Sequence, residues 1–272
     1  MSISIQKYQM QIFKTSLRLP LSLSNVGLNG EVARLPFHHR WHLRQLMYVH
    51  RLSNLQPQKH ICKRIFNTVL EMTLKSKNPP PNWITHTVDL FNMYDLEFDQ
   101  LKTLKRQQWK NLVDRQIRKK WIQEWQQEMN NRKIPRGFIR QAPPRWEPYL
   151  HDKYAREIIL LRNNMLLKNT YALWRKEDLR QLPCRHCHMT NVLSDLHILR
   201  DCPAFDTLRQ ELMTNTNTTD WKSWPTDKLI QFLLGYGKPL HINSPHWKFL
   251  TKVIHLSSCT WMSTNSRKKK RN

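Results

Sequence analysis

Hydrophobic side chains recur every three or four residues along most of this chain, which is the period of an amphipathic helix. The clearest case runs from about Leu101 to Met129, where apolar side chains stand four residues apart: Trp109, Val113, Ile117, Trp121, Trp125 and Met129. No strand-length run alternates with a period of two. The pattern therefore predicts a mainly α fold, built as irregular helical bundles, with this stripe in a core.

Prolines break this helical pattern, most strongly in the segment Lys75-Ser-Lys-Asn-Pro-Pro-Pro-Asn82. Such a segment is typical of a linker. The predicted organisation is a helical region at 1–78, a linker at 79–82, a basic helical region at 83–182, a small knuckle at 183–205, C-terminal helices at 206–262 and a basic disordered tail at 263–272. Core positions expected on either side of the linker are Ile61, Ile65, Phe66, Val69 and Leu70 before it, and Trp83, Val88 and Phe91 after it.

The knuckle is predicted from the spacing of four side chains, Cys-x2-Cys-x9-His-x4-Cys, at Cys184, Cys187, His197 and Cys202. Two cysteines separated by two residues can bind one ion from a tight turn. Three cysteines and one histidine fill a tetrahedral zinc site and leave no open position, so the expected cofactor is a structural zinc. His186 or His188 could replace His197 as a ligand, and free buried cysteines beside a surface histidine are the alternative without a metal.

The five-residue separation of His197 and Cys202 also predicts local structure. On an unbroken α-helix, positions five apart diverge by roughly 140°. We therefore expect the helix to end before Cys202, as the following Pro203 favours. Ser194 or Asp195 can cap the turn that carries the histidine.

The net charge of the chain indicates what kind of partner to expect. The chain of 272 residues contains 45 Lys and Arg against 20 Asp and Glu, a net charge of +25. Such an excess favours a polyanionic partner, RNA or single-stranded DNA. The candidate contacts are one face of the long helix (Lys102, Lys105, Arg106, Lys110, Arg115, Arg118, Lys119, Lys120) and a proline-rich basic loop at 131–148 (Arg132, Lys133, Arg136, Arg140, Arg145). A solvated face that binds nothing is the alternative.

Several stretches together resemble a known family. The stretches are Leu21–Asn25, Gly30–Arg40, Leu160–Tyr171 and the knuckle with its trailing Cys202–Arg209. They are similar to the region after the polymerase in non-LTR (LINE-type, jockey-like) retrotransposon reverse transcriptases. Departures from the family pattern are Asn163 and His188, each in place of an expected glycine, and Ser194 near the usual glutamate. The resemblance implies contact with RNA or DNA, and a separate polymerase or other element-encoded protein as a further partner.

Catalytic chemistry and membrane insertion are not expected. Polymerases hold two cations with neighbouring aspartates, whereas the only adjacent acids in this chain are Glu177 and Asp178. A nuclease accompanies the knuckle in some relatives, but the segment around Asp227 and Lys228 lacks the second carboxylate–lysine pair. Five cysteines, an odd number, favour a reducing compartment, and no apolar run is long enough to span a bilayer. The expected location is intracellular, nuclear or cytoplasmic, with Arg267–Arg271 as a possible import signal or phosphate contact.

Two functional hypotheses from different classes follow. The first is a non-catalytic zinc-knuckle module that binds RNA or single-stranded DNA. The second is an interaction or regulatory scaffold in which zinc only joins helices and no nucleic acid is bound. Salt-sensitive binding to single strands distinguishes the two.

Overall fold

The computed structural model describes residues 2–77, 79, 82–167, 183–184, 186–190 and 194–268; for residues 2–4, 6 and 258–268 it describes the backbone alone. Helices are the regular elements of this part of the chain, and it contains no strand. The prediction of a mainly α fold is confirmed. None of the described helices has both the length and the apolar character needed to cross a membrane.

The chain divides into two compact units. Unit 1 comprises Met1–Gln9 and Leu35–Trp125, and unit 2 comprises Met10–Arg34 and Gln126–Asn272. The expected linker at 79–82 lies inside unit 1, so it separates two helices and not two units. The reason is that α4 (Ile61–Lys75) and α5 (Trp83–Met93), which flank it, contact each other and both contact α3 (Phe37–Ser53).

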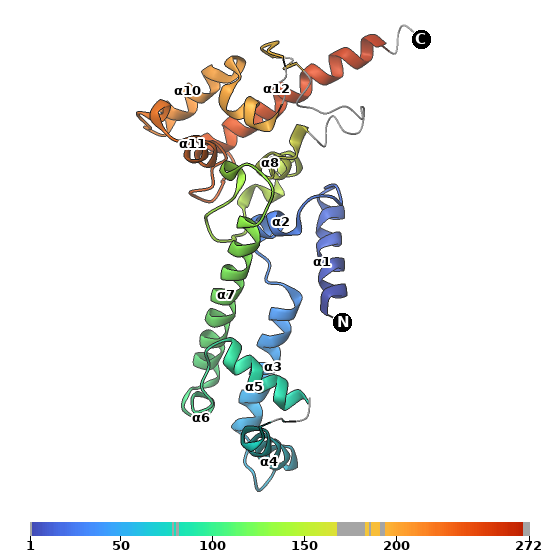
Figure 1. Cartoon of the computed structure of the whole chain (residues 1–272), viewed down its shortest axis with the longest axis vertical. Coiled ribbons are helices and arrows are strands. Elements are labelled where there is room, and N and C mark those ends of the chain that lie inside the picture. The colour runs from blue at the N-terminus through green and yellow to red at the C-terminus, as the bar shows by residue number, and fades with distance from the viewer. Residues whose placement is uncertain are drawn as a thin grey trace. The chain divides into compact units, whose positions relative to one another are not determined.

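The core of unit 1 forms where α3 meets α7 (Arg106–Asn130), two antiparallel helices that can be followed in Figure 1. The indole N–H of Trp109 donates to the Leu46 carbonyl (3.1 Å), and its ring stacks on His50. The whole predicted stripe from Trp109 to Met129 is buried, as expected. The helix predicted from about Leu101 is instead two helices, because Leu104 is extended and separates the short α6 (Gln100–Thr103) from α7.

Near the linker the predicted core is only partly correct. Phe66 and Phe91 are buried, but Ile61, Ile65 and Trp83 are exposed. The period identifies an apolar face but not whether another helix covers it. α4 packs against α3 and α5 through the side that carries Phe66; Val69 and Leu70 are half-buried at its edge, and Ile61, Ile65, Met72 and Leu74 face outward.

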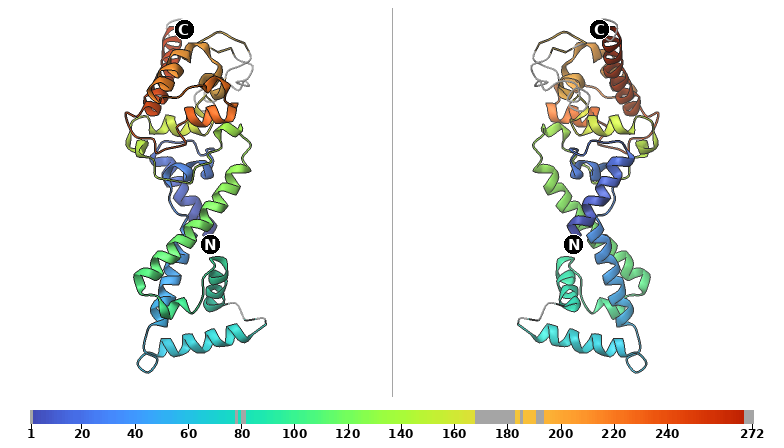
Figure 2. Two further views of the ribbon diagram at one scale, coloured as in Figure 1. Left: turned by 90° about the vertical axis from the view of Figure 1, so that its left-hand side faces the viewer. Right: turned by 90° about the vertical axis from the view of Figure 1, so that its right-hand side faces the viewer.

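Unit 2 is a set of short helices around one apolar core. Its elements are α2 (Asn25–Val32), η1 (Arg136–Phe138), η2 (Pro148–His151), α8 (Ala155–Arg162), η4 (His197–Asp201), η5 (Pro203–Phe205), α10 (Asp206–Asn215), η6 (Trp221–Ser223), α11 (Thr226–Leu233) and α12 (Pro245–Lys268). α11 contacts η1, η4 and α12, and α12 contacts α8 and α10 (Figure 2). Leu160, Leu199, Ile230 and Leu250 are among the fully buried side chains at these contacts.

The structure of the C-terminal tail differs from the prediction. Residues 263–268, expected to be disordered, belong to α12, which continues to Lys268. No glycine or proline follows Pro245 in the sequence, so nothing in the covalent chain interrupts the helix that begins in the core. Residues 269–272 lie outside the described residues, as do residues 168–182 of the expected basic helical region.

A buried ionic network stands at the centre of unit 2. Arg162 donates to Glu31 (2.7 Å), which also accepts from the Tyr149 hydroxyl (2.8 Å). Glu147 accepts from Arg140 and from Arg145, both at 2.9 Å, and from the backbone N–H of Leu240 (2.8 Å). Three guanidinium groups thus share two buried carboxylates; Arg140 and Arg162 are buried with them and Arg145 is partly exposed, so each buried charge depends on its partners.

Candidate metal centre and nucleic-acid interface

The structure brings together the four side chains that the spacing selected. The donor atoms of Cys184, Cys187, His197 and Cys202 all lie within 4.8 Å of one another. The Sγ atoms of Cys184 and Cys202 are 3.7 Å apart, and Cys187 Sγ is 3.4 Å from His197 Nε2. In a tetrahedral zinc site, bond lengths of about 2.3 Å to sulfur and about 2.0 Å to nitrogen give S–S and S–N separations of about 3.8 and about 3.5 Å. The cluster can therefore hold a metal ion, and its dimensions are compatible with zinc.

A widened helical turn positions two of these donors. η4 is a π-helix, closed by a hydrogen bond from the Cys202 N–H to the His197 carbonyl (2.8 Å). Its larger circumference returns residues five apart to the same side. The helix ends at Asp201 and Cys202 is extended, as expected from Pro203. Ser194 accepts from the His197 N–H (3.0 Å), so it is the cap.

Two buried side chains hold the centre in place. Arg209 donates to the carbonyls of Ile198 (3.3 Å), Leu199 (3.0 Å) and Cys202. These carbonyls at the end of the π-helix have lost their helical partners, and the guanidinium supplies the missing donors. Asp195 accepts from the N–H groups of Leu166 and Leu167, both at 3.0 Å. The position of Arg209 seven residues after Cys202 hinted at this role, but the partners of Asp195 lie too far away in sequence to be foreseen.

His188, directly after the second cysteine, adopts a backbone conformation that is uncommon for a residue with a side chain. Its φ is 59°, in the left-handed region, and its N–H donates to the Cys184 carbonyl (2.7 Å). Side chains with a Cβ pay roughly 1–2 kcal/mol there, although histidine is among the residues found more often. The turn that contains both cysteines ends with this φ, a conformation that glycine adopts without strain.

We expect His188→Gly to raise the free energy of unfolding by roughly 0.5–1 kcal/mol, because relief of the left-handed strain exceeds the extra chain entropy of glycine. Metal content should not change. Urea unfolding followed by circular dichroism measures the shift. His186→Gly is the matched control: His186 lacks a positive φ and packs on Phe205 (4.9 Å between ring centroids), so that change should destabilise. Equal losses in the two variants would contradict the strain argument.

The expected cationic face of α7 is open to solvent. Five side chains on it are exposed: Arg106, Lys110, Arg115, Arg118 and Lys119; Lys105, directly before the helix, is exposed as well. Lys102 is exposed on α6 and Lys120 is half-buried. The one ion pair on this face joins Arg118 to Asp114 (2.7 Å) at its surface. Since the opposite face of the helix is in the core, these side chains project into solvent, where a polyanion can reach them.

The basic loop is only partly available, which corrects two predicted contacts. Arg140 is buried and binds Glu147, so it cannot reach a phosphate. Arg145 directs its guanidinium to Glu147 and to the carbonyls of Tyr236 and Lys238. Lys133 and Arg136 are exposed and Arg132 is half-buried. The sequence alone does not distinguish the five cations. Only the fold shows that the buried Glu31 and Glu147 pair with Arg140 and Arg145.

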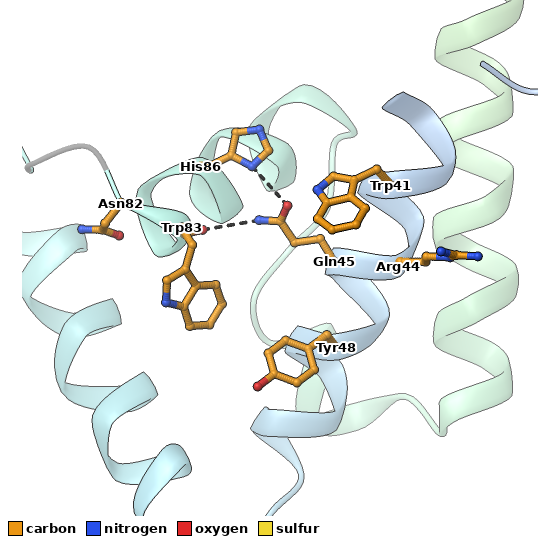
Figure 3. A pocket seen from close by; sticks show the side chains of 7 residues that line it. All are labelled: Trp41, Arg44, Gln45, Tyr48, Asn82, Trp83 and His86. Carbon is orange, nitrogen blue, oxygen red and sulfur yellow. Dashed lines mark hydrogen bonds between the residues drawn. The ribbon is translucent and has the colours of Figure 1, made fainter. Parts of the chain in front are cut away.

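An aromatic hollow in unit 1 was not predicted. It has a volume of about 720 Å³ and lies between α3 and α5, lined by Trp41, Arg44, Gln45, Tyr48, Asn82, Trp83 and His86 (Figure 3). Gln45 joins the two helices by donating to the Thr87 hydroxyl (2.9 Å) and contacting His86 (3.2 Å). Trp41, Tyr48 and Trp83 are each about half exposed. Large rings left in water beside a cation are typical of a surface that stacks on planar ligands.

Comparisons with protein-family models, with curated proteins and with solved structures give no match.

Proposed function

We propose that this chain is a non-catalytic module that binds RNA or single-stranded DNA and contains a structural zinc. The observation that carries the proposal is the cationic face of α7, where five exposed cations stand on a helix whose other face is buried, with the exposed Lys105 directly before its first residue. The aromatic hollow supports single strands as the ligand, since unpaired bases expose planar faces and every base can stack. Both features belong to unit 1.

Zinc is the ion that suits the Cys₃His centre. Three thiolates and an imidazole are the ligands of closed structural zinc sites. The backbone elements around them, η4 and the turn at His186–Cys187, are short. The ion would therefore join α10 and α11 to the segment before the knuckle, and would not take part in chemistry.

The resemblance to the post-polymerase region of LINE-type reverse transcriptases is part of the proposal. Its support is that the similar stretches, far apart in sequence, contact one another in unit 2. Glu31 in one pairs with Arg162 in another at 2.7 Å, and Asp195 in the knuckle accepts from the N–H of Leu166 in that second stretch at 3.0 Å. An upstream in-frame polymerase palm with paired aspartates in the flanking DNA would establish this origin, and unrelated flanking DNA would count against it.

The binding proposal predicts a defined salt dependence. If Lys105 and the five exposed cations of α7 each neutralise one phosphate, log affinity should fall with log salt with a slope of about −4, taking about −0.7 per contact for single strands. Reversing Lys105, Arg106, Arg118 and Lys119 to glutamate should reduce the slope to about −1. Fluorescence anisotropy of a labelled single-stranded oligonucleotide between about 50 and about 200 mM salt measures it.

The control carries the same change in net charge elsewhere on unit 1. Arg51, Lys59, Arg64 and Lys77 are exposed and lie off α7, so their reversal to glutamate should leave most of the slope intact. Zinc content should be the same in all three proteins. Equal slopes for the two reversed variants, or no binding by the wild type at low salt, would contradict the proposal and favour the scaffold hypothesis, which the exposed Ile61, Ile65 and Met72 of α4 would then serve.

A further inference from the structure

A second group of potential metal ligands lies in unit 1, far in sequence from the Cys₃His centre. His38 and His39, at the start of α3, meet Glu124 on α7, and their donor atoms all lie within 4.8 Å of one another. His39 is buried, His38 is half-buried and Glu124 is 43% exposed. The group thus sits at the edge of a core, with one side open to solvent.

One nitrogen in this group lacks a partner. Nε2 of His39 is buried and makes no hydrogen bond, although Oε2 of Glu124 is only 3.2 Å away. The Glu124 oxygen therefore does not lie in the direction in which an N–H at Nε2 of His39 would point. Two atoms that ligate the same ion have this arrangement. Two ligand atoms on one tetrahedral ion, each with a bond of about 2.0–2.1 Å, stand about 3.3 Å apart. The lone pair of each atom points at the ion and not at the other ligand atom.

The other nitrogen of His39 explains the orientation of the ring. Nδ1 is 3.0 Å from the Tyr94 hydroxyl, which is 2.6 Å from Nδ1 of His42. If His39 donates to Tyr94 and Tyr94 donates to His42, the proton is on Nδ1 and the Nε2 lone pair faces a carboxylate. Two electron-rich atoms at that distance repel unless a cation lies between them. A metal-ligating histidine usually donates its second N–H to such an outer partner.

We propose that His38, His39 and Glu124 bind a divalent transition-metal ion, with Tyr94 as the residue that orients His39. Two imidazoles and one carboxylate are a donor set suited to zinc. Three protein ligands leave a fourth position, which the exposed side of Glu124 opens to water. This site differs from the Cys₃His centre in donor chemistry as well as in place, since it contains no sulfur.

The ion itself is the probe for the test. Wild-type protein whose Cys₃His centre already holds zinc is titrated with Zn²⁺ in an isothermal calorimeter, and separately with Co²⁺ in a spectrophotometer. We expect one additional equivalent, and Co²⁺ at this site should give the weak absorption of nitrogen and oxygen ligands without a thiolate band. Glu124→Gln and His38→Gln should each lower the affinity about 10–100-fold or abolish it.

Two matched controls separate this site from adventitious binding. Glu97→Gln and His60→Gln change an exposed acid and an exposed histidine of the same unit and should leave the titration unchanged. Tyr94→Phe, which removes only the hydroxyl, should weaken binding about tenfold while a circular dichroism spectrum shows that the helices persist. Absence of the additional equivalent in the wild type, or equal binding by wild type and Glu124→Gln, would overturn the proposal.

Discussion

Cys187→Ser is expected to contain one zinc equivalent fewer than the wild type and to lose the ordered structure around the knuckle. Structural zinc sites contribute on the order of 10 kcal/mol to folding in small zinc domains. Here the ligands come from a turn, a π-helix and an extended residue, and two of the sulfurs, those of Cys184 and Cys202, are fully buried. Without the ion, these elements keep the hydrogen bonds of Arg209 and Asp195 and the burial of Ile198 and Leu199. Elemental analysis and the midpoint of thermal unfolding measure the two effects.

Metal binding at the Cys₃His centre should depend on pH. Burial raises the pKa of the Cys202 thiol to about 12, so in the absence of an ion this sulfur stays protonated near neutral pH. Metal binding must release that proton, so the apparent affinity should fall as the pH is lowered. Cys62→Ser is the matched control, because Cys62 is exposed and lies in unit 1, and its zinc content should equal that of the wild type. Equal zinc in Cys187→Ser and Cys62→Ser would contradict the assignment of ligands.

Glu31→Gln is expected to cost about 3–5 kcal/mol of folding free energy, the second large effect. The carboxylate of Glu31 is the partner of Arg162 at 2.7 Å and of Arg140 at 3.4 Å, and none of the three side chains is more than 2% exposed. Removing its charge leaves three arginines with Glu147 as the remaining carboxylate. Buried charge without compensation is far more costly than the pair itself is stabilising. Urea unfolding followed by circular dichroism measures the loss.

A surface pair in the same unit provides the control. Glu211 pairs with Lys252 at 2.7 Å, and both side chains are 46% exposed. Solvent screens such a pair, so Glu211→Gln should change the free energy of unfolding by at most about 1 kcal/mol. If the two glutamine variants unfolded at the same urea concentration, the network around Glu31 would have no special role in stability.

Local physical chemistry determined much of this protein from sequence alone. The four-residue repeat of Trp109 to Met129 is confirmed as a buried stripe, because the period of a helix places those side chains on one face whatever packs against it. The metal centre could be predicted for a similar reason. Its four ligands lie within 19 residues of chain, so their spacing and the proline after Cys202 already restrict the turns that can join them.

Tertiary structure decided the features that depend on distant partners. Arg140 and Arg136 look alike in the sequence, yet one is buried against Glu147 and the other is exposed, because a charge is neutralised by neighbours in space. Trp83 was expected in the core and lies at a half-open hollow, since hydrophobic spacing identifies a face and not its cover. The meeting of His39 with Glu124, 85 positions later, follows only from the antiparallel packing of α3 on α7. Contacts between residues far apart in sequence leave no local pattern in the sequence. The chain entropy lost when such residues are brought together is offset by the packing of the whole core, not by the two residues that meet.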